Sequence, residues 1–172
     1  MRTPLLRTPI LAVLLATLAL PSAAQSLMLK GPSGQTLSLS RADLAALPHV
    51  GFTFDAHGRK HAYEGVPLID LLARVGAPTG KALGGRALAN AVRSTSADGY
   101  QVVFGLGEAD PGTRSNRIIV ADRADGAPLD DKEGPFRLVV EGDLRPARGA
   151  RMLTTLEVIP LGAAAPSGDH VH

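Results

Sequence analysis

Apolar and polar residues alternate in short runs along most of the chain, a pattern typical of strands rather than of long helices. Two such runs flank the turn Gly31-Pro32-Ser33-Gly34 near the start. Further apolar runs of strand length, with turn residues between them, cover residues 52–54, 60–64, 91–94, 101–104, 118–121, 137–140 and 156–159. Asp-Gly and other turn residues separate several of these runs, so we expect hairpins to join most neighbouring strands.

Two segments carry helical spacing instead. Ser40 followed by Asp43 has the form of a capping box, and Pro48 ends that segment. A second helix is predicted to begin after Pro67 and to end at Gly76. Its apolar stripe consists of Leu68, Leu71, Leu72 and Val75. About two helices and about seven or eight strands predict an α+β fold with mixed, mostly antiparallel sheets.

The first 24 residues are typical of a secretory signal peptide. Arg2 and Arg7 carry the only charges, an apolar run extends from Ile10 to Leu20, and Ser22-Ala23-Ala24 supplies the small residues of a cleavage site. The apolar run is shorter than the roughly 20 residues that span a bilayer, and no later segment is apolar for as long. We therefore predict export to the periplasm, with no membrane span after signal cleavage.

The length and charge of the chain indicate how many domains it forms and which class of partner it lacks. Removing 24 of the 172 residues leaves 148, the size of a single domain with room for a hydrophobic core. We predict one domain over residues 25–161 and a disordered tail over residues 162–172. The 18 basic residues include two in the signal segment, so the mature chain balances its 16 acids. With 3% aromatic residues it lacks the cationic surface and stacking platforms of nucleic-acid binders, and we predict no nucleic-acid partner.

The sequence contains no cysteine. Disulfides, thiolate metal ligands, iron–sulfur clusters and cysteine nucleophiles are therefore excluded. An exported protein could have used disulfides, so its hydrophobic core alone must hold the predicted domain together. The sequence also lacks a G-x-S-x-G elbow and a glycine-rich phosphate loop, which leaves hydrolase and nucleotidase functions without support.

Five segments, in order, resemble the molybdopterin-binding domain of sulfite oxidase-like enzymes. The first is Tyr63-Glu64-Gly65-Val66-Pro67-Leu68 followed by Leu71-Leu72 and Gly76, and the second is Asp98-Gly99-Tyr100. The others are residues 121–129, which end in Gly126-Ala127-Pro128-Leu129, residues 132–140, and the basic run from Arg145 to Arg151. The similarity extends from about Ser40 to Ile159. The resemblance implies a sulfite oxidase-type fold and a cofactor cleft lined by main chain and by basic residues near the pterin phosphate.

One feature of that family is missing. Its enzymes bind the metal through a cysteine upstream of the G-V-P-L helix start, whereas residues 49–64 here offer only oxygen and nitrogen donors. A thiolate donates charge to the metal and tunes its potential, which a harder carboxylate or imidazole does not reproduce. The resemblance thus implies a place for molybdopterin without a protein sulfur for molybdenum. If a metal were bound, Asp55 is an oxygen donor that could ligate it.

Three arginines are the first candidates for ligand binding. Arg145, Arg148 and Arg151 recur every three residues, which places them on one side of a helix or of a polyproline-like segment. Each could bind phosphate, sulfate or carboxylate through two hydrogen bonds. The alternative is a solvated row paired with nearby acids, namely Glu141, Asp143 and Glu157. Their position in the family resemblance favours the anion site.

Two loops contain further candidates. Arg114 and Asn116 precede an apolar strand, as binding residues on loops often do, although a polar surface loop has the same composition. Asp98 and Tyr100 belong to the predicted hairpin turn. Asp98 either binds a ligand or forms the turn with Gly99, and Tyr100 either offers its hydroxyl to a ligand or packs its ring in the core.

Other charged residues have structural interpretations. Arg137 opens an apolar strand, so we expect it to pair with Glu133 or Asp122, because an unpaired buried charge is costly. His57 and His61 are predicted on a hairpin, where residues four apart do not form a zinc pair as they do on a helix.

Three functions are compatible with these features. The first is a periplasmic binding module that holds a small anion, a pterin or a protein partner without redox catalysis, which the missing cysteine favours. The second is a molybdopterin-dependent oxidoreductase whose metal is held by the dithiolene alone or by an oxygen donor. The third is a sensor or structural partner of an inner-membrane protein, bound through an exposed sheet face.

Overall fold

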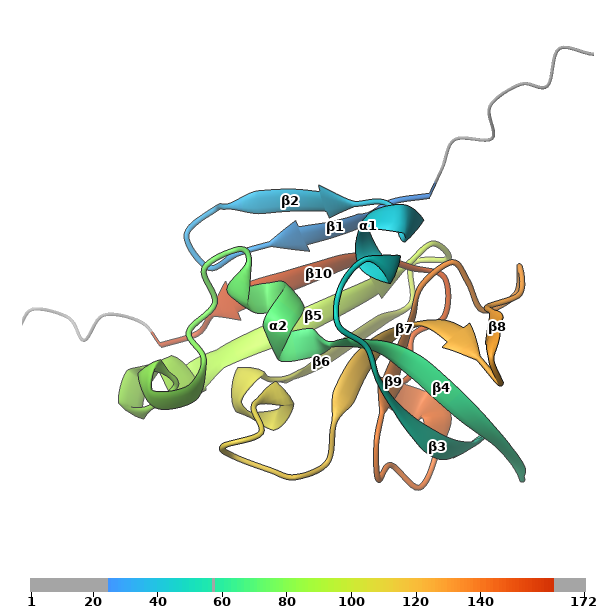
Figure 1. Ribbon diagram of the computed structural model, residues 1–172. Helices are drawn as coiled ribbons and strands as arrows, with labels where there is room; N and C mark the ends of the chain where they lie inside the picture. The colour runs from blue at the N-terminus through green and yellow to red at the C-terminus, as the bar shows by residue number, and fades with distance from the viewer. Residues whose placement is uncertain (1–24, 57, 163–172) are drawn as a thin grey trace, which may run out of the picture.

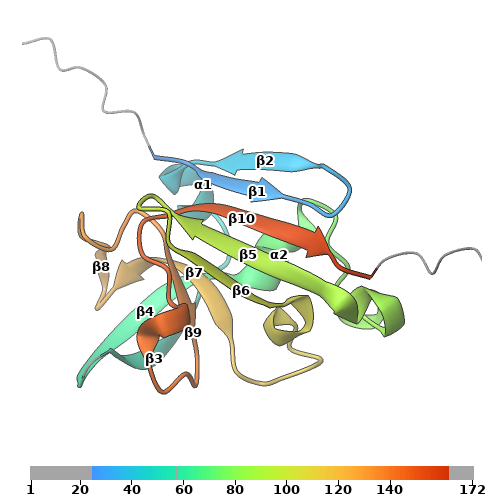
Figure 2. The same ribbon diagram turned by 180° about the vertical axis from the view of Figure 1, so that it is seen from behind.

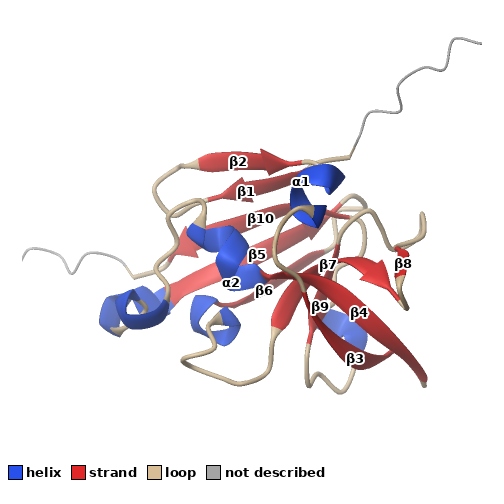
Figure 3. Cartoon of the chain, in the orientation of Figure 1, coloured by secondary structure: helices blue, strands red, loops and turns tan. Residues whose placement is uncertain are grey.

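The computed structural model describes residues 25–56 and 58–162. Within them the chain forms two α-helices and ten strands arranged in two sheets, which confirms the α+β class (Figures 1 and 3). The predicted signal peptide, His57, and the predicted tail from residue 163 onward lie outside the described residues. None of the helices in the described ranges has the length and hydropathy of a membrane span.

The first sheet is mixed. Its order is β2-β1-β10-β5-β6, in which β1 and β10 are parallel and all other neighbours are antiparallel. Its strands are β1 (Leu27–Lys30), β2 (Thr36–Leu39), β5 (Asn90–Ser96), β6 (Gln101–Gly105) and β10 (Leu153–Pro160). Strand β10 therefore lies between β1 and β5, and its first residue, Leu153, pairs with Ser96 at the end of β5.

The second sheet is antiparallel. Its order is β3-β4-β7-β8, and β9 pairs with β7 as well. Its strands are β3 (Val50–Ala56), β4 (Arg59–Pro67), β7 (Ile118–Ala124), β8 (Ala127–Pro128) and β9 (Arg137–Val140). Strands β3 and β4 form a long hairpin that reaches beyond the rest of the sheet (Figure 2).

The two helices form where the sequence predicts them. Helix α1 (Arg41–Ala45) has the expected capping box between Ser40 and Asp43. Helix α2 (Leu68–Ala73) buries its predicted stripe, while Val75 is buried just beyond the end of the helix and Gly76 follows with a φ of 81°. Four 3₁₀ turns complete the structure: η1 (Gly80–Ala82), η2 (Gly85–Ala89), η3 (Leu106–Ala109) and η4 (Pro146–Arg148).

Two apolar clusters hold the sheets in place. The larger cluster joins both sheets to helix α2, and residues such as Leu71, Leu138 and Leu156 are fully buried in it. The smaller cluster lies against the second sheet and includes Phe52 and Tyr63. Because strand β7 contributes buried residues to both clusters, the second sheet is packed on both faces and fixes the base of the β3–β4 hairpin.

Candidate binding cleft

Three segments that are far apart in the sequence enclose a cleft of about 1060 Å³. They are the β3–β4 hairpin, the β5–β6 turn, and the segment from Asp143 to Met152 that leads from β9 to β10. Glu133 and Arg137 close it from a fourth side. The volume suits an organic ligand of moderate size, since such sites commonly measure about 300–1000 Å³.

Local hydrogen bonds explain why these segments meet. In the β5–β6 turn, Asp98 Oδ1 accepts from the backbone N–H of Tyr100 at 2.9 Å, and Gly99 has a φ of 86°. The Tyr100 hydroxyl, on a ring that is half exposed, donates to the carbonyl oxygen of Ala147 in η4 at 2.5 Å. Asp98 thus forms the turn, and Tyr100 joins the turn to the arginine-bearing segment at the edge of the cleft.

Three cations line the cleft without an anionic partner in the part of the chain that the structure describes. Arg59, Arg145 and Arg151 line it, and no ion pair joins any of them to another described residue. Of the acids in the lining, Asp55 accepts from the backbone N–H of Gly58 at 2.7 Å, and Asp98 is committed to its turn. The three guanidinium groups are therefore available to an anion.

A buried cluster forms the fourth side. Arg137 is only 4% exposed, and its guanidinium pairs with Glu133, donates from Nη1 to the Tyr63 hydroxyl at 2.7 Å, and lies 4.9 Å from the centre of the Tyr63 ring. The predicted pairing of Arg137 with Glu133 is confirmed. The Tyr63 hydroxyl in turn donates to Glu133 at 3.4 Å, and burial raises the pKa of this phenol above its ordinary value.

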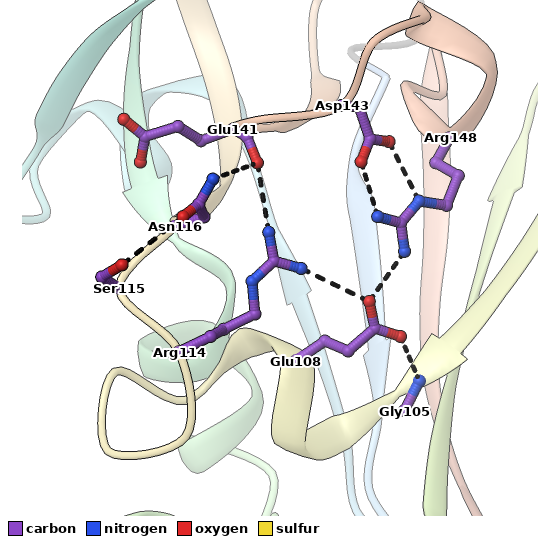
Figure 4. A network of polar contacts seen from close by, with 8 residues as sticks. All are labelled: Gly105, Glu108, Arg114, Ser115, Asn116, Glu141, Asp143 and Arg148. Atoms are coloured by element: carbon purple, nitrogen blue, oxygen red, sulfur yellow. Dashed lines mark hydrogen bonds and ion pairs between the residues drawn. The ribbon is translucent and has the colours of Figure 1, made fainter.

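Arg148 does not join the other two arginines in the cleft lining, contrary to the expected row. The 3₁₀ turn η4 includes Arg148 but neither Arg145, which precedes it in an extended conformation, nor Arg151, so no regular helix runs through all three arginines. Instead Arg148 makes a two-point pair with Asp143, at 2.9 and 2.6 Å, and a third bond to Glu108 at 2.7 Å (Figure 4). These carboxylates raise its pKa, and its charge is already matched. The paired alternative describes Arg148, while Arg145 and Arg151 remain available.

Arg114 and Asn116 also lie outside the cleft lining. Arg114 pairs with Glu108 at 3.4 Å and donates to the backbone carbonyl of Glu141, which Asn116 contacts as well (Figure 4). Glu108 also accepts from the backbone N–H of Gly105. We call Glu108, Arg114, Asn116, Asp143 and Arg148 the anchor network. Its contacts connect η3, the loop before β7 and the segment after β9, which carries Arg145.

Two histidine–carboxylate contacts flank the second sheet. His61, which lines the cleft, has Nδ1 2.7 Å from Asp125, and this hydrogen bond together with one from the Ala62 N–H lowers the pKa of Asp125. His49 lies 3.1 Å from the buried Asp122. The carboxylate of Asp125 therefore fixes the orientation of the His61 ring in the lining of the cleft.

Several lining residues were not singled out in the sequence. Arg59 follows the hairpin turn, Ser96 ends β5, and Met152 precedes β10, so each stands at an element boundary. Only the turn signal beside Arg59 could have drawn attention to any of them. Ser96 and Met152 reach the cleft because β10 pairs with β5, which is a long-range event.

The donor set of the cleft suits phosphate and carboxylate better than a sulfur-ligated metal. Asp55 lines the cleft in the region where the resembled family has its cysteine, and its carboxylate is held by the Gly58 N–H. Among the described residues, no group of three or more histidine or acidic side chains is arranged to hold a metal ion. The arginines could hold the phosphate of a pterin cofactor, whereas the chain has no thiolate to offer molybdenum.

Comparison with known proteins identifies a similar fold. The structure matches the sulfane dehydrogenase SoxCD from Paracoccus pantotrophus with a TM-score of 0.61 at 19% sequence identity, over 83% of this chain. The chain spans 40% of the length of that protein. No family model matches the sequence, and the search of curated proteins found no match either. The likeness supports a fold related to that of SoxCD.

Proposed function

We propose that this chain is a periplasmic binding module of the sulfite oxidase-like fold that holds a small anionic ligand, such as a phosphorylated pterin, without catalysing redox chemistry. The observation that carries this proposal is a set of arginines in the cleft lining that form no ion pair within residues 25–56 and 58–162. Arg145 and Arg151 come from the same segment, and Arg59 comes from the β3–β4 hairpin. A guanidinium that no carboxylate neutralises is free to make two-point bonds to an anion.

The chemistry of the donors separates binding from redox catalysis. If molybdopterin binds here, it supplies the metal's dithiolene ligands, and this chain contributes arginines for its phosphate and Asp55 as the nearest counterpart of the family's metal ligand. Asp55 offers a hard oxygen in place of a thiolate, which gives a different redox centre from that of the family's enzymes. A ligand-holding role needs no such centre.

The direct test is calorimetric titration of the purified mature chain with inorganic pyrophosphate. We expect binding that weakens as salt is raised, because the attraction is between charges. The double variant Arg145→Gln/Arg151→Gln should weaken binding at least about tenfold, the loss expected for two charge-assisted contacts. Arg74→Gln, at the exposed end of α2, is the matched control and should bind as the parent does. Equal affinity of parent and double variant would contradict the proposal.

Metal analysis separates the binding module from the oxidoreductase alternative. The chain would be produced with its own export signal in a host that makes molybdopterin. The proposal expects molybdenum far below one equivalent. A redox-active molybdenum content of about one equivalent per chain would establish that Asp55 or the dithiolene alone suffices, and the function would have to be redefined as catalytic.

A further inference from the structure

We propose that the cleft recognises its ligand at a second point, the inner wall formed by Ser96, Arg137 and Met152, where Ser96 Oγ and Arg137 Nε donate hydrogen bonds to a neutral acceptor, such as the carbonyl oxygen of a lactam ring. This inference rests on the proposed function, which places the anionic end of the ligand at Arg145 and Arg151. It adds the chemical class of the other end.

Two orphaned donors carry the inference. Among the described residues, Ser96 Oγ and Arg137 Nε are the buried side-chain polar atoms without a hydrogen-bond partner, and both residues are only 4% exposed. Both residues line the same cleft. Other buried polar groups are matched; Ser94 Oγ, for example, donates to the carbonyl oxygen of Val102. Buried polar groups in folded proteins nearly always have partners, so two orphans in one wall indicate a place where a ligand supplies them.

Backbone hydrogen bonds of Met152 connect the strand end that carries Ser96 to the segment that carries Arg137. The backbone N–H of Met152 donates to the carbonyl oxygen of Glu133 at 2.8 Å, and its carbonyl oxygen accepts from the Ala97 N–H at 2.9 Å. These bonds tie the end of β5, next to Ser96, to the segment that leads into Arg137. Met152 has a φ of 47°, in the left-handed region that residues other than glycine rarely adopt, and such strain gathers at ligand sites. Its flexible side chain lines the cleft and can move aside for a ligand atom.

Charge decides which kind of acceptor fits the inner wall. Arg137 is already paired with Glu133, so this wall offers N–H and O–H donors without a surplus positive charge. Arg145 and Arg151 carry the unmatched charge elsewhere in the cleft. A ligand that satisfies both places is anionic at one end and carries a neutral carbonyl at the other, which describes a phosphorylated lactam heterocycle. A second full anion at the inner wall would meet Glu133 at close range.

A matched pair of probes tests the wall. Inosine 5′-monophosphate and adenosine 5′-monophosphate have the same phosphate and nearly the same shape, but the first carries a ring carbonyl where the second carries an amino group. We expect the parent chain to bind the inosine compound about tenfold more tightly. Its ring carbonyl can accept a hydrogen bond from the inner wall, whereas the amino group of the adenosine compound is itself a donor and would face the donors of the wall. Ser96→Ala should bring the two affinities within about twofold, while ribose 5-phosphate, which has no base, should bind parent and variant alike.

Ser94→Ala is the control, because it removes a buried hydroxyl from the same strand two residues away and outside the cleft lining. It should keep the preference for inosine 5′-monophosphate. Equal binding of the two nucleotides by the parent chain, or a preference that survives in Ser96→Ala, would overturn the inference. In that case pyrophosphate binding that depends on Arg145 and Arg151 would leave the proposed function standing. Conversely, inosine and adenosine without phosphate test the wall even if the arginines bind no anion.

Discussion

The cleft and the anchor network contain the same residue types in opposite states. In the anchor network Arg148 has two carboxylate partners, Asp143 and Glu108, and Arg114 shares one of them (Figure 4). In the cleft Arg145 and Arg151 have no such partner among the described residues, although they come from the same short segment as Arg148. A matched guanidinium fixes a loop, whereas an unmatched one is available to a ligand.

The difference also shows how the molecule separates support from recognition. The anchor network ties η3, the loop before β7 and the segment after β9 together, so the arginines in the cleft are presented by a held backbone. A site whose supporting residues are fixed loses less conformational entropy when a ligand binds. The following variants are expected to sharpen or break this division, from the largest effect to the smallest.

Removal of Glu133 should have the largest effect, because it leaves the charge of Arg137 buried and unmatched. We expect Glu133→Ala to lower the free energy of unfolding by about 3 kcal/mol, measured by urea denaturation. Glu157→Ala is the control, since its partner Arg93 is 38% exposed, and there the loss should stay within about 1 kcal/mol. Equal losses in the two variants would mean that the buried cluster is no more important to stability than a surface pair.

Removal of Glu108 tests the anchor network. Glu108→Ala abolishes the contacts to Arg114, Arg148 and the Gly105 N–H, and we expect a loss of about 1 kcal/mol, modest because the carboxylate is 36% exposed. Glu108→Gln keeps an acceptor for Gly105 and should lose about half as much. Both variants should also weaken pyrophosphate binding less than the double arginine variant does. If either Glu108 variant weakened pyrophosphate binding more than Arg145→Gln/Arg151→Gln does, Glu108 would belong to the binding site, and the distinction between anchor network and cleft would be wrong.

The pH dependence of stability should report on Glu141, which contacts the anchor network. Its two-point pair with Arg117 holds the pKa of Glu141 below the ordinary value of 4.5. A carboxylate with a lowered folded pKa stabilises the fold above the unfolded value, and the benefit is lost as the pH falls through the folded pKa. Glu141→Gln should therefore lose less stability than the parent when thermal unfolding is followed from about pH 5 downward. Parallel pH curves would contradict this.

The smallest effect concerns the two serines of β5. Ser96→Ala removes a hydroxyl that has no partner, so its stability should equal or exceed that of the parent by up to about 1 kcal/mol. Ser94→Ala removes a hydrogen bond to Val102, and its stability should fall by about 0.5–1 kcal/mol. In differential scanning calorimetry, the unfolding midpoint of Ser94→Ala should lie below that of the parent. The midpoint of Ser96→Ala should lie at or above it. A clear loss in Ser96→Ala would indicate a partner that holds this hydroxyl in the free protein.

Local features were predictable from the sequence because they depend on neighbouring residues. The capping box of Ser40 and Asp43, the stripe of α2 and the Asp98-Gly99 turn each depend on contacts within about one turn of chain. The pairing of Arg137 with Glu133 also spans only four positions. The α+β class and the mixed sheets followed from the number and spacing of these elements. The short strand β8 was not predictable, because a segment of two residues is too short to show an alternation of apolar and polar positions.

The composition of the cleft was decided by the tertiary structure. The sequence determined the fold class, the local turns and the absence of a thiolate, but spacing by three could not reveal that Arg148 turns to Asp143 and Glu108 while Arg145 and Arg151 line the cleft. Nor could it show that Ser96 and Arg137 share one wall, because β10 has to pair with β5 before Met152 connects them. Charge pairing and burial act between residues that are brought together only by folding, and these two quantities separate a supporting arginine from one that can bind a ligand.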